Sequence, residues 1–317
     1  MKSDFIWMDG DLVPYEKATV PIITPTLHYG VGVFEGIRCY RTPEGSAVFR
    51  LREHLERFLD SIHILGIREF PFGVEDMRIA VHQTIKVNGF TECYIRPLMY
   101  LQGEMGLNMD KSTPRLAIAA WEWGPYLGQE ARNGGIHMMV SSFTRLHPNI
   151  NLTKSKTTGN YVNSMLVKTL ALRSGYDEAV ILDPEGFVAE CTGENLFLVR
   201  EGVLYTPPRS IILEGITRDT VITLAGDMNI PVVEAMITRD QLYIADEVFI
   251  TGTAAEIVGV RMVDFRQIGK GRPGPITQAL SQAFSDNVHG QGAHSDEWLD
   301  FVSMNQPVSG ETVLIDF

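Results

Sequence analysis

The stretch that decides the fold class runs from Tyr161 to Tyr205 and reads YVNSMLVKTLALRSGYDEAVILDPEGFVAECTGENLFLVREGVLY. Its first part predicts a helix over Tyr161–Ser174, because apolar side chains recur there at helical spacing and Gly175 follows as a C-cap. The side chains on that face are Val162, Met165, Leu166, Thr169 and Leu170. Short apolar runs separated by Pro-Glu-Gly and Glu-Gly turns then predict strands. These are Glu178–Leu182, Phe187–Ala189, Leu196–Val199 and Val203–Tyr205. Runs of short strands with helices interspersed favour a mixed α/β (α+β) fold over a doubly wound sheet.

Further elements are predicted on both sides of this stretch, with short strands mixed among helices in the first third. Helices are expected over Arg50–Gly66, Val74–Val87, Ile216–Ala225 and Ile276–Val288. Strands are expected over Glu92–Leu101, Leu116–Trp121, Ile136–Ser142 and Glu247–Thr251.

A group of turn residues marks the expected domain boundary. The apolar periodicity lapses at Gly124–Gly128, which reads GPYLG. We therefore expect a small N-terminal α/β domain over residues 1–122, an interdomain loop over 123–135 and a larger domain over 136–317. Residues 303–317 match no motif, and we expect them to be peripheral.

The charge balance argues against nucleic acid as a partner. The chain of 317 residues has 27 Lys and Arg against 39 Asp and Glu, which gives a formal charge of −12. Such a surface repels a phosphate backbone. An anionic small substrate must therefore be held by a few local cations.

The cysteines and the apolar runs predict a cytoplasmic protein. Cys39, Cys93 and Cys191 are odd in number and far apart, so neither a disulfide framework nor a metal site is expected. No stretch reaches the roughly 18 apolar residues that span a bilayer. Residues 1–5 lack the apolar core of a signal peptide. We therefore expect no membrane partner.

One string imitates a dinucleotide-binding fingerprint. Residues 269–274 read GKGRPG and precede a predicted helix. A Rossmann unit would then need a strand that ends in an acidic residue about 20 positions further on, and here the helix runs into HGQG instead. The string is predicted to be a surface turn.

Four other segments carry residues suited to catalysis or anion binding. Leu152–Tyr161 places two lysines just before a predicted helix, and Glu190 lies where a strand ends. Gly215–Arg218 opens a helix whose first N–H groups can bind an anion such as phosphate. Thr251–Glu256 ends a strand in a turn of small residues with exposed amides.

These segments resemble the branched-chain amino acid aminotransferases, which are class IV, fold type IV pyridoxal phosphate enzymes. The resemblance runs from about Asp4 to about Val302 and keeps the family's order of motifs. The matching motifs are Leu27–Arg38 (LHYGVGVFEGIR), Tyr94–Pro97 (YIRP), Trp123–Gly128 (WGPYLG), Lys156–Tyr161 (KTTGNY), Glu190–Phe197 (ECTGENLF), Leu213–Arg218 (LEGITR) and Asp246–Ala254 (DEVFITGTA). The fold that the resemblance implies has a small α/β domain and a larger domain with a pseudo-barrel β core.

The resemblance implies reversible transamination between branched-chain L-amino acids and 2-oxoglutarate, with pyridoxal 5′-phosphate as cofactor. It assigns Lys156 as the catalytic lysine that forms a Schiff base with the cofactor. Periodicity places Lys154 on the same face, and the Lys-x-x-Gly-Asn-Tyr spacing selects Lys156. Tyr161 is expected to contact the cofactor's 3-oxygen, Glu190 its pyridine nitrogen and Arg57 its phosphate. Further cofactor contacts are implied for Leu213, Ile216, Thr217 and Thr253.

The chemistry explains why these residue types are needed. Moving a proton from the substrate's Cα requires negative charge to be delocalised into the cofactor ring, and a carboxylate at the ring nitrogen keeps that nitrogen protonated. A lysine that the substrate amine has displaced stands at the reacting carbons and can act as the general base.

The implied substrate pocket is aromatic and carries one cation. Aromatic walls suit branched aliphatic side chains, whereas Arg96 is expected to bind the γ-carboxylate of glutamate. The substrate-binding residues implied by the family are Tyr29, Phe34, Tyr94, Arg96, Met105, Tyr126 and Ala254.

Three alternatives stay open at this point. A D-amino acid transaminase and an aminodeoxychorismate lyase share the lysine, the glutamate and the phosphate elements. A non-catalytic module of the same fold would lack Lys156 or Glu190, and neither is lost. The family builds its site at a dimer interface, so the resemblance implies a homodimer at minimum and leaves a hexamer open.

Overall fold

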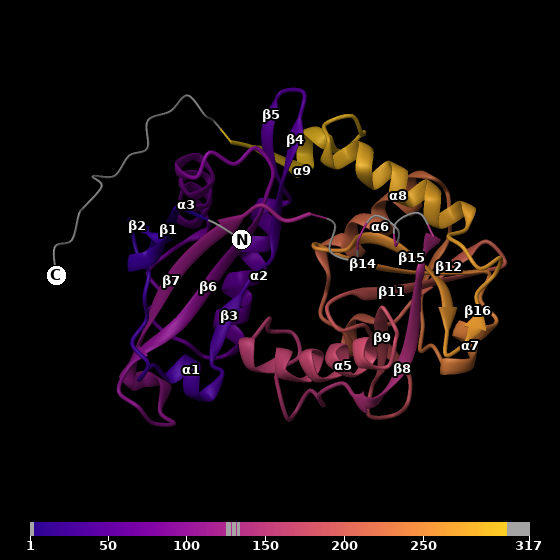
Figure 1. The fold of residues 1–317 in the computed structure, drawn as a ribbon, viewed down its shortest axis with the longest axis horizontal. Helices are drawn as coiled ribbons and strands as arrows, with labels where there is room; N and C mark the ends of the chain where they lie inside the picture. Colours follow the sequence, from indigo (N-terminus) through magenta and orange to yellow (C-terminus); the bar gives the residue numbers. More distant parts are fainter. Residues whose placement is uncertain (1–2, 125–127, 129–130, 132–133, 303–317) are drawn as a thin grey trace. The chain divides into compact units, whose positions relative to one another are not determined.

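The computed structural model describes residues 3–124, 128, 131 and 134–302. Its contacts divide the chain into two units (Figure 1). The first comprises residues 1–123, 155–159 and 287–317, and the second comprises 124–154 and 160–286. Each unit is built on its own sheet, so the mixed α/β class expected from the sequence is confirmed.

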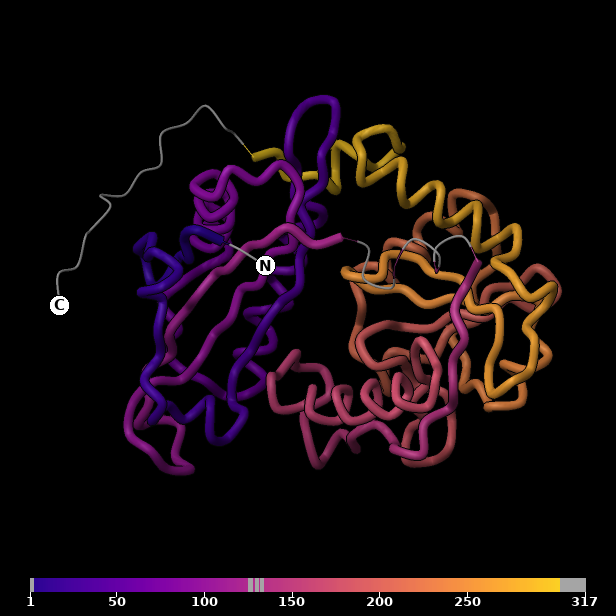
Figure 2. Tube along the Cα trace, viewed as in Figure 1, coloured from indigo at the N-terminus to yellow at the C-terminus, as the bar shows by residue number. Residues whose placement is uncertain are grey.

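The sheet of the first unit is antiparallel throughout its described pairs. Its order is β17-β5-β4-β6-β7-β1-β2, and β3 also pairs with β6. Strand β17 comes from the end of the described chain and lies beside β5 (Figure 2). The strands are β1 (Phe5–Met8), β2 (Asp11–Pro14), β3 (Gly32–Phe34), β4 (Ile37–Thr42), β5 (Gly45–Phe49), β6 (Cys93–Gly103), β7 (Ser112–Trp121) and β17 (Leu299–Phe301).

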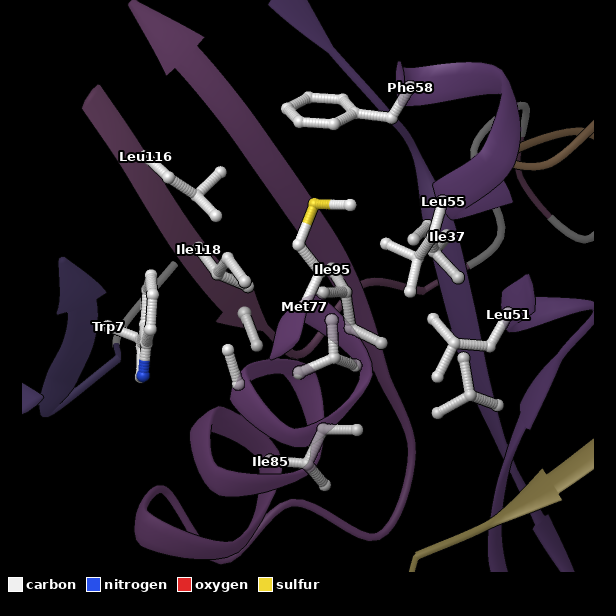
Figure 3. Packing of buried hydrophobic residues seen from close by; sticks show 14 of the residues in the cluster. Trp7, Ile37, Leu51, Leu55, Phe58, Met77, Ile85, Ile95, Leu116 and Ile118 are labelled. Carbon is white, nitrogen blue, oxygen red and sulfur yellow. The ribbon is translucent and has the colours of Figure 1, made fainter. Parts of the chain in front are cut away.

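Two amphipathic helices build the core of the first unit together with this sheet. Helix α2 (Leu51–Ile64) buries Leu51, Leu55 and Phe58, as its sequence spacing predicts (Figure 3). Helix α3 (Val74–Val87) has the predicted bounds. Close packing of one face fixes the rotation of α2 about its axis, so its other faces have defined directions. The remaining helical elements of this unit are η1 (Tyr15–Lys17), α1 (Pro25–Tyr29), η2 (Met109–Lys111) and α9 (Ser295–Trp298).

The sheet of the second unit mixes parallel and antiparallel pairs. Its order is β10-β9-β8-β15-β14-β11-β12-β13, with β16 on β15. The parallel pairs are β8 with β9, β8 with β15, and β12 with β13. The strands are β8 (Ile136–Thr144), β9 (Glu178–Leu182), β10 (Val188–Glu190), β11 (Asn195–Arg200), β12 (Val203–Thr206), β13 (Val232–Glu234), β14 (Glu247–Gly252), β15 (Glu256–Val263) and β16 (Arg266–Gln267).

Helices α5 (Tyr161–Arg173), α6 (Ile216–Asp227) and α8 (Pro275–Val288) agree with the sequence predictions within a few residues. The short elements η3 (Thr158–Asn160), η4 (Arg209–Ile211) and α7 (Arg239–Tyr243) were not predicted. The GKGRPG string forms turns and bends before α8, which confirms its prediction as a turn. None of the helices in the described part of the chain is long and apolar enough to cross a membrane.

Helix α5 exposes the apolar face that the sequence identified. Val162, Met165, Leu166 and Leu172 are 59%, 69%, 51% and 56% exposed, whereas Val167 and Ala171 are buried. The buried pair packs against β9 in a small core with Ala179 and Ile181. A contiguous exposed apolar stripe of this kind is typical of an interaction surface.

Candidate active site

The main chain of Lys156 is held by two elements of the first unit. The N–H of Phe34, at the end of β3, donates to the Lys156 carbonyl at 3.1 Å. The N–H of Lys156 donates to the Ser61 hydroxyl on α2, also at 3.1 Å. Thr157 forms a β-bridge with Val33, so this segment extends the edge of β3. The Lys156 Nζ lies 5.1 Å from the centre of the Phe34 ring.

Lys154 is held differently, by groups of the second unit. Its Nζ donates to the carbonyls of Arg209 and Ile212 and to the carboxylate of Glu214, the last at 3.0 Å. These contacts anchor the loop before α6. The two lysines of one short segment therefore have different surroundings, and those of Lys154 are structural.

A buried carboxylate, Glu35, lies next to Phe34 and binds two side chains of α2. Arg57 donates to it through Nε at 2.7 Å and through Nη2 at 2.8 Å, in a bidentate pair. The Nδ1 of His54 lies 2.8 Å from the same carboxylate. The N–H of Gly36 also donates to it, at 3.2 Å.

The protonation states of Glu35 and His54 depend on each other and on Arg57. Burial by itself would raise the pKa of Glu35, but the charges and hydrogen bonds of Arg57 and His54 outweigh it and hold that pKa below its ordinary range. Burial lowers the pKa of His54 more than Glu35 raises it. We therefore assign an ionised Glu35 that accepts a hydrogen bond from the Nδ1–H of a neutral His54. Glu35 and His54 were not singled out from the sequence as site residues.

Arg96 lies among aromatic side chains on β6 and its neighbours. Its guanidinium carbon is 4.7 Å from the centre of the Phe34 ring, 5.4 Å from that of Tyr94 and 5.8 Å from that of Trp121. Its Nη2 donates to the Tyr94 hydroxyl at 3.2 Å, while its buried Nε has no hydrogen-bond partner among the described residues. A cation with an unsatisfied buried donor is suited to accept an anionic ligand.

In the described part of the chain, the other side chains predicted to line the pocket are not among those in contact with Arg96. A Cβ at Gly36 would overlap with the Tyr94 hydroxyl, so the glycine leaves room for that side chain. Tyr29, on α1, is 45% exposed, and Met105 lies in the partly exposed loop after β6. Tyr126 lies outside the described residues. Trp121 was not predicted, and it lies directly opposite Tyr94 in the β6–β7 register, which only the structure shows.

In the second unit, Glu190 is fixed by a cation and a backbone amide. Arg145 Nη1 contacts one carboxylate oxygen, and the N–H of Leu213 donates to the other at 2.9 Å. Asn195 Nδ2 in turn donates to the Leu213 carbonyl at 3.0 Å. The contacts with Arg145 and the Leu213 N–H fix the orientation of the Glu190 carboxylate. Arg145 was not predicted, since it lies far from Glu190 in sequence.

The same loop leads into the N-terminus of α6. Gly215 is the N-cap residue of α6 and has no side chain of its own, so the backbone N–H groups of the first turn, at Ile216 and Thr217, lie at the positive end of the helix dipole. Gly215 approaches Asn195 so closely that a Cβ would overlap with its side-chain oxygen. This geometry is suited to a phosphate group.

Two more predicted residues of this unit lie at element ends. Thr253 and Ala254 form the turn between β14 and β15, next to Thr251, whose buried hydroxyl has no hydrogen-bond partner in the described structure. Tyr161 opens α5 and is half-buried. The predicted residues thus fall into two groups. Lys156, Arg57, Phe34, Tyr94 and Arg96 lie in the first unit, and Tyr161, Glu190, Leu213, Ile216, Thr217, Thr253 and Ala254 lie in the second.

Comparisons with a family model and with curated proteins both match aminotransferases. The family model described as "Amino-transferase class IV" matches residues 32–263. A branched-chain-amino-acid aminotransferase of Pseudomonas aeruginosa is 47% identical over 95% of this chain and 98% of its own length. One of Escherichia coli K12 is 45% identical, with the same two coverages.

Solved structures of branched-chain aminotransferases are similar in fold to this protein along nearly the whole chain. A branched-chain amino acid aminotransferase of T.th. with pyridoxamine 5′-phosphate has a TM-score of 0.93 and 46% identity, and covers 96% of this chain and 100% of its own. The Escherichia coli enzyme has a TM-score of 0.92 and 44% identity, and covers 95% and 100%. A further T.th. structure contains N-(5′-phosphopyridoxyl)-L-glutamate, and has a TM-score of 0.91 at 44% identity, with coverages of 96% and 100%.

Proposed function

Because the chain belongs to the class IV aminotransferases, we propose that it transfers amino groups reversibly between branched-chain L-amino acids and 2-oxoglutarate, with pyridoxal 5′-phosphate as cofactor. The products are the branched-chain 2-oxo acids and L-glutamate. The observation that carries this proposal is similarity over nearly the full length of two branched-chain aminotransferases.

The residues present fit the cofactor by the chemistry of their donors. The uncapped first turn of α6 and the Thr253 turn offer N–H and hydroxyl donors to a phosphate, and Glu190 offers a carboxylate to a protonated ring nitrogen. When bound, pyridoxal phosphate supplies an electron sink for charge that develops at the substrate's Cα. Tyr161 is the proposed donor to its 3-oxygen.

Lys156 is the proposed catalytic base, which moves the proton at the substrate's Cα. Its backbone is held on both sides by Phe34 and Ser61, so the side chain projects from a fixed point. Lys154 is occupied with carbonyls and Glu214. The fixed main chain of Lys156, together with the structural contacts of Lys154, supports Lys156 as the reactive lysine.

The proposed pocket combines apolar walls with the Arg96 guanidinium. Phe34, Tyr94 and Trp121 provide apolar surface for leucine, isoleucine or valine side chains. The unsatisfied Nε of Arg96 can donate to the γ-carboxylate of glutamate. One pocket can thereby accept both an apolar and an acidic side chain.

Replacing Arg96 by alanine or methionine should separate the two substrates. We expect KM for glutamate and 2-oxoglutarate to rise about tenfold or more, roughly 1.4 kcal/mol, with a much smaller change for the branched substrates. The measurement is kcat/KM of each half-reaction by stopped-flow absorbance. Arg41→Ala is the control, because that arginine is exposed and donates to Thr91, away from the proposed pocket residues. Equal losses for both substrate classes would show that Arg96 instead binds the common α-carboxylate or maintains the fold.

The test of the reaction itself is a substrate panel. Purified holoenzyme is assayed with L-glutamate against 2-oxo acids of leucine, isoleucine, valine, phenylalanine and alanine, and then with D-glutamate. Amination restricted to the branched acids with the L donor is expected. Turnover of D-glutamate would favour the D-transaminase instead, and no amination with either donor would favour the lyase.

The proposed assembly is a homodimer at minimum, with a hexamer as the next larger one. The exposed apolar stripe of α5 supports this, because water would otherwise contact Val162, Met165 and Leu166. The proposed location is the cytoplasm, where Cys39, Cys93 and Cys191 would stay reduced as free thiols.

An acidic substitution on this stripe should weaken the assembly. Leu166→Asp is expected to lower the molar mass in light scattering from at least twice that of one chain towards that of one chain, because a buried unpaired carboxylate is costly. Ile79→Asp on α3 is the control, since Ile79 is 48% exposed and apolar too. A wild-type chain that is monomeric at micromolar concentration would contradict the proposal.

A further inference from the structure

The Glu35 cluster is a polar group inside an otherwise apolar layer. Glu35, His54 and Ser61 are each at most 1% exposed. His54, Arg57 and Ser61 lie three and four residues apart on α2 and therefore share one face of the helix. The first two bind Glu35, and the third binds the main chain of Lys156. One helix face thus holds both the buried carboxylate and the lysine segment.

Stability alone does not account for such a cluster. Burying a carboxylate and a guanidinium removes both from water, and apolar side chains of similar volume would serve the core as well or better. What the cluster does supply is orientation. The Nε and Nη2 contacts with Glu35 fix the plane of the Arg57 guanidinium, so the direction of its remaining edge is fixed too.

We propose that Glu35, supported by His54, is a positioning residue that orients Arg57 for the cofactor phosphate. The inference rests on the proposed function, in which Arg57 is the phosphate arginine. Glu35 does not touch the cofactor in this proposal. It acts through the bidentate pair, and His54 holds the same carboxylate by a second contact within the buried layer.

The experiment measures binding to the apoprotein rather than turnover. Dissociation constants are determined by absorbance and fluorescence titration for pyridoxal 5′-phosphate and for pyridoxal, which lacks the phosphate. Glu35→Gln is expected to weaken pyridoxal phosphate roughly tenfold or more and pyridoxal by less than about twofold. A purely structural role would weaken both alike.

A double-mutant cycle tests whether the effect passes through Arg57. In an Arg57→Ala background, Glu35→Gln should add less than about twofold to the loss for pyridoxal phosphate. Glu178→Gln is the matched control, because Glu178 is also fully buried and paired with a cation, Lys168, in the other unit. It should leave the preference for the phosphorylated form unchanged.

A second pair of variants keeps the test decisive if Glu35→Gln does not fold. His54→Asn retains an N–H donor near the Nδ1 position and should bind pyridoxal phosphate within about threefold of wild type, whereas His54→Leu should lose roughly tenfold.

One outcome would overturn the positioning role of Glu35, and another would overturn the assignment of Arg57 as the phosphate ligand. If Arg57→Ala selectively weakens pyridoxal phosphate but Glu35→Gln and His54→Leu do not, the positioning role is wrong and the proposed function stands. If Arg57→Ala weakens both compounds equally, Arg57 is not the phosphate ligand, and the inference falls with that assignment.

Discussion

Replacing Lys156 by alanine is expected to remove covalent attachment of the cofactor and to reduce turnover by roughly 10³-fold or more, because the attaching amine and the general base are then lost together. Wild-type protein should be yellow as purified, and the variant should lack the corresponding visible absorbance after dialysis. The measurements are an absorbance spectrum and the rate of 2-oxoglutarate formation from glutamate.

Lys154→Ala is the matched control from the same segment. Its Nζ contacts the Ile212 carbonyl and Glu214, in a half-exposed ion pair of the kind that contributes little to stability. The variant should keep its colour and most of its activity. If Lys154→Ala were colourless and Lys156→Ala were not, the motif alignment that selects Lys156 would be wrong.

The sequence was sufficient to predict those elements whose structure is decided by local apolar periodicity. Helices α2 and α3 follow from apolar spacing, because Leu51, Leu55 and Phe58 repeat at intervals that only a helix places on one side. Strand β15 was missed. It contains Gly259, which is unfavourable in a strand by propensity, and the glycine is needed because a Cβ there would overlap with Pro273.

Helix α5 shows the limit of the same reasoning. Its apolar spacing correctly predicts a helix, but the apolar face is exposed and the smaller Val167 and Ala171 face the core. Periodicity reports that a face is apolar and does not report what covers it. A surface that meets another chain and one that meets the core have the same pattern.

The missed site residues depend on pairs that are distant in sequence. Glu35 meets Arg57 although β4 and β5 lie between them in the chain, and Arg145 meets Glu190 across α5 and β9. No local pattern marks such pairs, since buried and exposed charges look alike in a sequence. The His54–Arg57–Ser61 spacing was the one available signal, because it places three polar residues together on an otherwise well-packed helix.

The surroundings of Glu190 determine what its substitution should do. Arg145 and the Leu213 N–H each donate to one of its oxygens, so the orientation of this largely buried carboxylate is fixed. An ionised carboxylate can keep a ring nitrogen protonated, whereas a carboxamide cannot. The loop to α6 is also tied through Asn195, so loss of one contact to Leu213 should not unfold it.

Glu190→Gln is therefore expected to retain cofactor and fold but to slow proton transfer at the substrate's Cα by about 10²–10³-fold, the usual effect of removing one electrostatic partner of a transition state. The single side-chain oxygen of glutamine can still accept from Arg145, while its NH₂ group cannot accept from the Leu213 N–H and supplies no negative charge to a ring nitrogen. The measurement is single-turnover kinetics with leucine and with Cα-deuterated leucine, beside a cofactor titration. A larger isotope effect than in wild type is expected, because the proton step becomes more fully rate-limiting.

Glu185→Gln is the control, since that exposed residue lies in the turn just before β10 and should change neither the rate nor cofactor binding. Unchanged single-turnover rates in Glu190→Gln would remove Glu190 from this role, and loss of cofactor without a change in the rate of the loaded enzyme would make it a binding residue only.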